Sequence, residues 1–333
     1  MDAVRQATIY EVASHAGVSI ATVSYVMNGK KKVSEDTAAR VKEAAEKLGY
    51  HPNQSARSLR SSKSGLIGMI IPTYDNAFFG AYAEFIARML KKRGFSLFVA
   101  CSLEDEDMEQ RLLDMMQSLQ VEALLIDPVR IGFDYNRLLA NYSFPVVYYD
   151  RKPESENFNG VFCNVRGAIR QVVEDMIDRG RKRIALLLPD TMHNAVQFRL
   201  EGFYDALDSK GIKRNPMLVL RGNATEKNGY DYADYAIKSL KADAILTANR
   251  TMAVGTIRYF NTHSIHPRED LSVAVMGVYD WSSVLVPQIT TVIEPIEPMA
   301  AQTVDLLMKL VAKPDRTPEI ITLDGYISEL TSI

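Results

Sequence analysis

Cysteine and long apolar segments are both scarce in this 333-residue chain. Its two cysteines, Cys101 and Cys163, are too few for a disulfide framework and suit a reducing cytosol. No charged start is followed by an apolar signal core, and the longest apolar runs fall far short of a membrane-spanning helix. We therefore expect a soluble cytoplasmic protein without a membrane partner.

Motifs of enzymes are also missing. The sequence contains no G-x-G-x-x-G motif and no P-loop, and Gly17–Ala21 matches a nucleophile elbow only in part. His263 and His266 have a ligand-like spacing, but no cysteine or other histidine is near them in the sequence. We therefore expect no enzymatic activity, no metal site and no cofactor.

Length and charge indicate more than one domain. With 333 residues and 47% apolar content, the chain is too long for one small domain and can form a sizeable core. Residues 1–63 hold 10 Lys and Arg against 6 Asp and Glu, or +4, so the other 270 residues carry −6 of the formal net charge of −2. A basic N-terminal segment on an acidic remainder favours a small nucleic-acid-binding unit attached to another domain.

The segment 8–28 predicts two short helices around a tight turn. Thr8 and Glu11 form a T-x-x-E capping box, Gly17 is placed to end the first helix, and Ser19 can cap a second. This arrangement is typical of a helix-turn-helix, in which the second helix enters the major groove of DNA. An ordinary helical hairpin in a larger α domain would fit the same residues.

The neighbouring residues support nucleic-acid binding. The outer face of the second helix carries short or polar side chains that suit contact with DNA, and Lys30–Lys32 would contact phosphates. Ser34 caps a third predicted helix that Gly49 ends, residues 54–60 could form a short helix, and residues 61–65 resemble a linker.

Four motifs then make a family resemblance specific. Thr8–Asn28, Val33-Ser34, Leu48–Asn53 and Ala56–Leu59 occur in the order and spacing of the lactose/galactose repressor family, which this sequence resembles. The resemblance implies a hinge helix that folds against the minor groove, with Leu59 as an intercalating wedge. The expected DNA-binding residues are Thr8, Ser19, Ile20, Ala21, Thr22, Ser24, Tyr25, Asn28, Lys32, Tyr50, Asn53, Ala56, Arg57, Leu59 and Arg60.

Beyond residue 64, strand-like and helix-like segments alternate, which predicts an α/β domain with parallel sheets covered on both faces. The expected strands are 66–71, 96–100, 123–126, 146–149, 183–188, 218–220, 244–247 and 271–276. About 270 residues favour two lobes, with ligands bound beyond the carboxyl ends of the strands. We thus expect a helix-turn-helix head over 1–50, a hinge over 51–64 and a two-lobed effector domain over 65–333.

The resemblance also covers this second part and implies a lobed fold like that of periplasmic binding proteins. Crossovers between the lobes are expected near Val161–Asn164, Thr291–Glu294 and Ile321–Leu323, giving a first lobe of about 64–162 plus 293–322. Residue by residue, the family motifs place Phe78, Phe79, Asp127, Asp150, Arg199, Asn249, Asp280 and Glu294 at the effector. Two alternatives remain: Asp127 could be only a helix cap, and Arg199 only a surface ion pair.

These observations predict a ligand-responsive transcriptional repressor of a carbohydrate-utilisation operon. It would bind a pseudo-palindromic double-stranded operator as a homodimer, because the tail after Tyr326 is too short for a tetramerising helix. The effector would be a sugar, acidic and phosphorylated sugars included, because Arg199 offers a planar fork and Arg250 a second positive charge. The alternative is a cytoplasmic sugar- or nucleobase-binding protein without DNA-directed function.

Overall fold

The computed structural model describes residues 7–28, 33–50, 64–130, 132–191, 193–277 and 285–333, to which the structural statements below refer. The chain separates into two compact units, Met1–Ser64 and Gly65–Ile333, here called the head and the body. None of the described helices combines the length and apolar content needed to cross a membrane.

The described part of the head is helical. It contains α1 (Ile9–Ala16), α2 (Ile20–Asn28) and α3 (Glu35–Lys47). Val12, Val23 and Val41, one from each helix, are fully buried at the centre of a small apolar cluster. Helical spacing of the apolar residues therefore produces one shared core from three short elements.

Two six-stranded sheets form the body, one in each lobe. The first sheet has the strand order β11-β5-β4-β3-β1-β2 and the second has the order β12-β10-β9-β8-β6-β7. The first consists of β1 (Leu66–Ile71), β2 (Ser96–Cys101), β3 (Ala123–Ile126), β4 (Val146–Tyr149), β5 (Asn159–Asn164) and β11 (Ile320–Asp324). The second consists of β6 (Ile184–Pro189), β7 (Val219–Gly222), β8 (Ala244–Thr247), β9 (Ser272–Met276), β10 (Thr290–Ile293) and β12 (Tyr326–Ile327).

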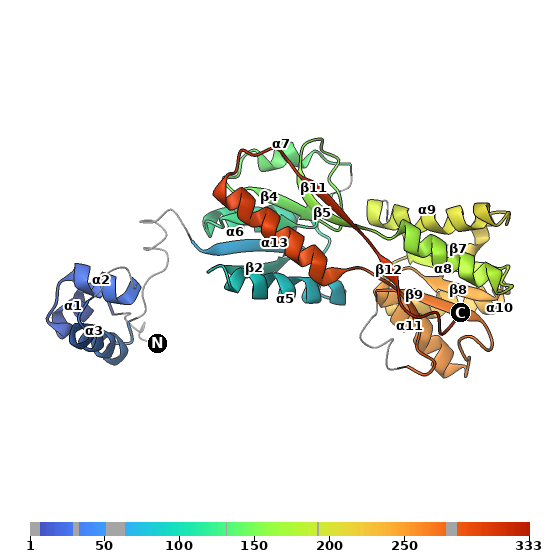
Figure 1. Ribbon diagram of the computed structural model, residues 1–333, viewed down its shortest axis with the longest axis horizontal. Coiled ribbons are helices and arrows are strands. Elements are labelled where there is room, and N and C mark those ends of the chain that lie inside the picture. Colours follow the sequence, from blue (N-terminus) through green and yellow to red (C-terminus); the bar gives the residue numbers. More distant parts are fainter. Residues whose placement is uncertain (1–6, 29–32, 51–63, 131, 192, 278–284) are drawn as a thin grey trace. The chain divides into compact units, whose positions relative to one another are not determined.

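Helices cover both faces of each sheet (Figure 1). The first lobe has α5 (Ala77–Lys91), α6 (Glu106–Ser118), α7 (Tyr135–Leu139) and α13 (Ile296–Ala312). The second has α8 (Arg166–Asp178), α9 (Asn194–Ser209), the 3-10 turn η1 (Pro216–Leu218), α10 (Glu226–Lys238) and α11 (Arg250–Thr262). The expected α/β class with doubly covered sheets is confirmed, and the strands pair in parallel except for β12, which pairs antiparallel with β10.

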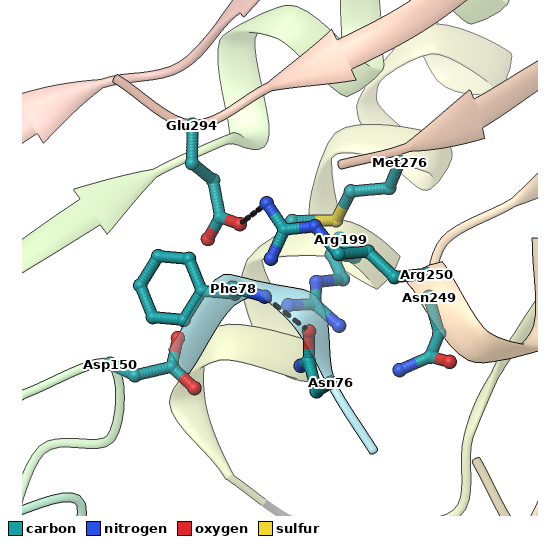
Figure 2. A pocket seen from close by; sticks show the side chains of 8 residues that line it. All are labelled: Asn76, Phe78, Asp150, Arg199, Asn249, Arg250, Met276 and Glu294. Atoms are coloured by element: carbon teal, nitrogen blue, oxygen red, sulfur yellow. Dashed lines mark hydrogen bonds and ion pairs between the residues drawn. The ribbon is translucent and has the colours of Figure 1, made fainter. Parts of the chain in front are cut away.

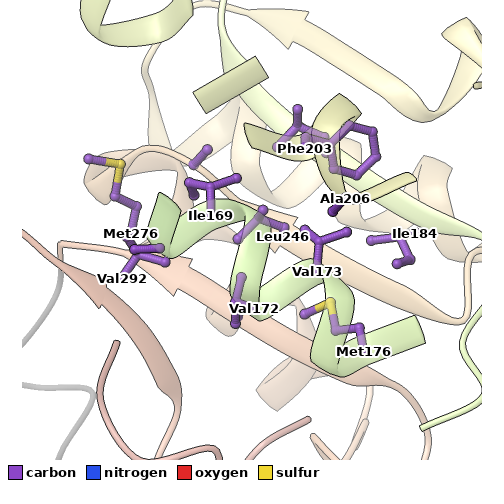
Figure 3. Packing of buried hydrophobic residues seen from close by; sticks show 14 of the residues in the cluster. Ile169, Val172, Val173, Met176, Ile184, Phe203, Ala206, Leu246, Met276 and Val292 are labelled. Carbon is purple, nitrogen blue, oxygen red and sulfur yellow. The ribbon is translucent and has the colours of Figure 1, made fainter. Parts of the chain in front are cut away.

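Side-chain alternation along the strands builds these layers. In β1, Ile67 and Met69 pack against α5 and α13, whereas Ile70 packs with α6 on the other face. In the second lobe, Leu186 and Leu188 face α8 and α9, where Val172, Val173 and Phe203 complete the cluster drawn in Figure 3. Both faces are buried, so the strands read as continuous apolar runs.

Three connections join the lobes, and two of them lie later in the chain than the sequence predicts. The chain crosses between β5 and α8, between β10 and α13, and at Gly325 between β11 and β12. The expected crossovers Val161–Asn164 and Ile321–Leu323 lie inside β5 and β11, because these two strands keep their parallel pairing as far as Asn164 and Asp324. A Cβ at Gly325 would lie 2.9 Å from Val165 Cγ1 and 3.1 Å from the Ile293 oxygen, so the three connections converge there.

Candidate functional site

The head presents one polar face of α2. The capping box at Thr8 and the left-handed Gly17 are confirmed, and the Ser19 hydroxyl accepts a 3.1 Å hydrogen bond from the Thr22 N–H. Ile20 and Tyr25 are 38% and 40% exposed, whereas Val23 on the opposite face is fully buried. Thr8, Ser19 and Ala21 are also exposed, and Thr22 and Ser24 are half-buried. The face expected to meet DNA is thus accessible in the head.

The other residues expected to contact DNA are either partly buried or lie outside the described residues. Tyr50 is half-buried and packs against the apolar cluster of the head, so its ring supports the fold. The side chain of Asn28 and the residues Lys32, Asn53, Ala56, Arg57, Leu59 and Arg60 lie outside the described residues. The structure adds Tyr10 on α1, which is 69% exposed and carries a phenol that can bond a phosphate.

The body contains two adjoining cavities between its lobes. The inner pocket has a volume of about 20 Å³ and is lined by Asn76, Phe78, Asp150, Arg199, Asn249, Arg250, Met276 and Glu294 (Figure 2). The outer chamber, of about 480 Å³, shares Asn76, Asp150, Arg199 and Asn249 with the inner pocket. Pockets of ~300–1,000 Å³ commonly hold small ligands.

The strand ends place the polar groups in these cavities. Asp150 follows β4 with φ 55°, a left-handed conformation that is uncommon outside glycine and that turns the chain at the cavity wall. Asn76 and Asn249 cap α5 and α11, their Oδ1 atoms accepting from the N–H groups of Phe78 and Met252 at 3.1 and 3.0 Å. Each amide nitrogen is therefore left to face the cavity.

Arg199 lies where both cavities meet. Its Nη1 donates a 3.0 Å hydrogen bond to the Ala248 oxygen, but its buried Nε has no partner among the described residues. Burial raises the pKa of Asp150, Glu294 raises it further, and Arg199 opposes the shift. The site is therefore a desolvated arrangement of donors and acceptors, which suits a ligand that completes the hydrogen bonds.

Arg250 is held within the inner pocket. Its Nη2 lies 3.0 Å from Glu294 Oε2, its Nε donates to the Gly277 oxygen, and its guanidinium carbon lies 5.1 Å from the centre of the Phe78 ring. The sequence suggested a second positive charge for an anionic ligand. In the structure that charge is paired with Glu294.

Asp127 requires a correction. It is fully buried, lines neither of the two cavities found in the described body between the lobes, and lies 3.5 Å from the Nε of Arg151. Burial raises its pKa well above the usual value, which the charge of Arg151 opposes. Asp127 therefore lies behind Arg151, not against the ligand space. The expected site residue Asp280 lies outside the described residues.

The two expected aromatic residues lie on different walls. Phe78 lines the inner pocket and Phe79 the outer chamber. Their ring centres are 5.4 Å apart in a T-shaped pair, and the rings are only 2% and 3% exposed. They form a rigid apolar side of the cavity.

Sequence reasoning missed most of the outer wall. Glu104, Arg151, Asp190 and His193 line the outer chamber, with Asn223 beside them. Each follows a strand of one of the two sheets, so the rule that ligands bind beyond strand carboxyl ends could have found them.

Known proteins are similar in sequence to this chain over almost its whole length. Residues 8–53 match the family model "Bacterial regulatory proteins, lacI family", and residues 173–327 match "Periplasmic binding protein-like domain". Catabolite control protein A of Staphylococcus xylosus is 29% identical over 92% of this chain and 93% of that protein. The HTH-type transcriptional repressor PurR of Histophilus somni (strain 2336) is 28% identical over 95% of this chain and 96% of its own.

Among solved structures, the Lac repressor dimer bound to operator and the anti-inducer ONPF aligns with a TM-score of 0.82. That alignment has 23% sequence identity and covers 98% of this chain and 99% of that one. A helix-turn-helix head joined to a two-lobed body with an internal polar cavity defines a ligand-responsive, DNA-binding transcriptional regulator, not an enzyme. Within that class, the chain carries the DNA-binding domain of the lacI family of bacterial regulatory proteins.

Proposed function

We propose that this regulator is a cytoplasmic repressor of a carbohydrate-utilisation operon, bound as a homodimer to a pseudo-palindromic operator. A neutral sugar in the inter-lobe cavity would change its operator affinity. The observation that carries the proposal is the convergence of Asp150, Arg199 and Asn249, from both lobes, on a cavity of about 480 Å³. Carboxylate, guanidinium and amide groups match the neighbouring hydroxyls of a sugar ring.

The charge of the walls favours a neutral ligand. The described residues lining the two cavities include five carboxylates (Asp75, Glu104, Asp150, Asp190 and Glu294) and three guanidiniums (Arg151, Arg199 and Arg250). Arg250 is paired with Glu294 and Arg151 with Glu104, so Arg199 alone of the three has no carboxylate within ion-pair distance among the described residues. A phosphate or carboxylate would meet more negative than positive charge. We therefore favour a neutral polyol over the acidic and phosphorylated sugars that the sequence also allowed.

The proposed mechanism is thermodynamic linkage between operator binding by the head and effector binding in the cavity of the body. In the described conformation the Lys152 N–H of the first lobe donates a 2.7 Å hydrogen bond to Asn194 Oδ1 of the second, and Arg250 of the second lobe lies over Phe78 of the first. A ligand that contacts both lobes would favour one inter-lobe angle over others. Because an effector shifts an equilibrium only by its differential affinity, the change in operator affinity must equal the change in effector affinity.

The experiment first identifies the operator sequence that the protein binds. Operators are selected from a randomised duplex library with the full-length protein, and analytical ultracentrifugation of the complex measures how many copies bind one operator. The selected duplex is then titrated in the presence of neutral sugars and their phosphate esters. We expect a two-fold symmetric sequence, two copies per duplex, and a shift in operator affinity with neutral sugars that the phosphate esters do not produce.

Two results would contradict the proposal. Selection of no sequence above random duplex would remove the assignment of operator binding. A response to phosphate esters alone would show that the ligand is anionic and that the charge argument fails.

A further inference from the structure

The two cavities offer very different amounts of room to a ligand. The inner pocket has a volume of only about 20 Å³, and Arg250 and Glu294 both line it. The guanidinium of Arg250 lies over Phe78 and contacts Glu294 and the Gly277 oxygen, so protein groups occupy this end of the cleft. The outer chamber of about 480 Å³ must therefore hold the bulk of any ligand that reaches Asp150 and Arg199.

Adjacent residues divide the cleft. Asp150 lines both cavities, whereas its neighbour Arg151 lines the outer chamber and is absent from the lining of the inner pocket. Arg199 and Asn249 meet Asp150 at the shared end. A ligand ring bound by these three groups would leave the part of the chamber beside Arg151 unfilled.

Polar groups line the part of the outer chamber beside Arg151, here called the far wall. Arg151 is 12% exposed, and its Nη1 and Nη2 donate to the two carboxylate oxygens of Glu104 at 2.8 and 2.5 Å. Asp127, buried behind it, lies 3.5 Å from its Nε. These two carboxylates fix the guanidinium plane from two sides, which preserves its geometry for a ligand. His193 and Asn223 line the chamber from the other lobe.

We propose that Glu104, Arg151, His193 and Asn223 form a second ligand subsite, and that the effector is a neutral disaccharide. This inference rests on the proposed function: one sugar ring binds at Asp150, Arg199 and Asn249, and the second ring binds against the far wall. Carboxylate, guanidinium, imidazole and amide groups alternate donors with acceptors, as vicinal hydroxyls require. Ala224, also on this wall, contributes little bulk and leaves space for the second ring.

The test compares matched ligands by isothermal titration calorimetry on the full-length protein. The panel contains glucose, galactose, mannose, fructose, xylose and arabinose, together with the neutral disaccharides formed from them. We expect at least one disaccharide to bind ten-fold or more tightly than either of its component monosaccharides. Glu104→Gln should lower the affinity for that disaccharide about ten-fold and change the affinity for the monosaccharides less than two-fold.

Two further variants keep the result interpretable. Arg151→Lys retains a positive charge beside the buried Asp127 but lacks the fork, so it should repeat the loss if Glu104→Gln proves unstable. Asp208→Asn is the matched control, because Asp208 forms a comparable pair with Arg214 on the surface and lines neither cavity between the lobes of the described body. This control should bind both ligand classes as the wild type does.

The outcomes separate the two proposals. Disaccharides that bind no more tightly than monosaccharides, or Glu104→Gln and Arg151→Lys losses that are equal for both classes, overturn the second subsite and leave a sugar-binding regulator. A wild-type protein that binds none of the panel overturns the proposed sugar function and the subsite together.

Discussion

In the head, the exposed residues Ile20, Ala21 and Tyr25 all lie on one helix, α2, whereas the body assembles its cavity from residues between Thr73 and Glu294. The head depends on a small shared core of three helices. The body depends on two sheets whose strand ends bring distant side chains together. The difference suggests that changes in one unit should leave the chemistry of the other intact, and the following predictions test this separation.

The largest expected effect is a loss of stability at the contact between α10 and α11. Gly229 approaches the backbone of Met252 so closely that a Cβ would overlap its carbonyl group. Gly229→Ala should therefore lower the free energy of unfolding of the body by about 3 kcal/mol, because backbone atoms cannot repack. Thermal unfolding measures the loss.

Gly167 in α8 provides the control for that substitution. A Cβ there would meet nothing within 4 Å, so Gly167→Ala should leave the body as stable as the wild type or slightly more stable. Equal losses in both variants would contradict the close contact as the cause, because alanine favours a helix more than glycine does.

Arg199 carries the next largest effect, on ligand binding. Arg199→Ala should weaken effector binding about 100-fold, or about 2.7 kcal/mol, because a buried charged donor is lost. Arg199→Lys should be nearly as severe, since the ammonium lacks the planar fork. Calorimetry with the identified effector measures both variants, and both should retain operator binding because the head is unchanged.

Arg170→Lys is the control for Arg199→Lys. Arg170 forms an exposed ion pair with Glu174 and should tolerate the change. Wild-type affinity in Arg199→Ala would place this residue outside the ligand site.

Tyr25 tests the head by itself. Tyr25→Arg should change which operator is preferred, by about ten-fold between half-site variants, because an exposed side chain on α2 can reach base edges. Selection from a randomised operator library measures the preference. Tyr10→Arg on α1 adds the same charge and should raise affinity for all sequences alike, so an unchanged ranking in both variants would contradict base recognition by Tyr25.

The head and the sheets were predictable because their signals are local. The capping box of Thr8, the left-handed Gly17 and the apolar runs of β1, β3 and β4 each depend on residues close together in the sequence. The same reasoning placed the first and third crossovers too early, since the lengths of β5 and β11 depend on their pairing with each other.

The cavity was predictable only in part. Family motifs pointed to Asp150, Arg199 and Asn249, which the structure brings to one place. The pairing of Arg250 with Glu294, 44 positions apart, and the position of Asp127 behind Arg151 depend on the packing of both lobes. No spacing rule in the sequence encodes these contacts, so the occupied inner pocket could not be predicted, whereas the strand-end rule could have found the residues of the far wall.

The smallest expected effect concerns the pH dependence of stability, and it should belong to the body. His193 lies in the outer chamber near Arg151 and Glu104. Burial and then the charge of Arg151 lower the pKa of its imidazole, Glu104 opposes both, and the result is a pKa of about 4. In the unfolded chain this pKa is about 6.5. Between these values the unfolded state binds more protons, so stability falls as the pH decreases from about 6.5 towards 4.

His193→Asn removes this proton uptake. The wild type should therefore lose more stability than the variant between pH 7 and pH 5, by on the order of 1 kcal/mol after allowance for the partial exposure of the ring. Thermal unfolding of both proteins at the two pH values measures the difference, and operator binding by the head at pH 7 should be the same in both. Parallel losses in the two proteins would mean that His193 takes up its proton over the same pH range in the folded and unfolded chains, with its imidazole open to solvent instead of enclosed between the lobes.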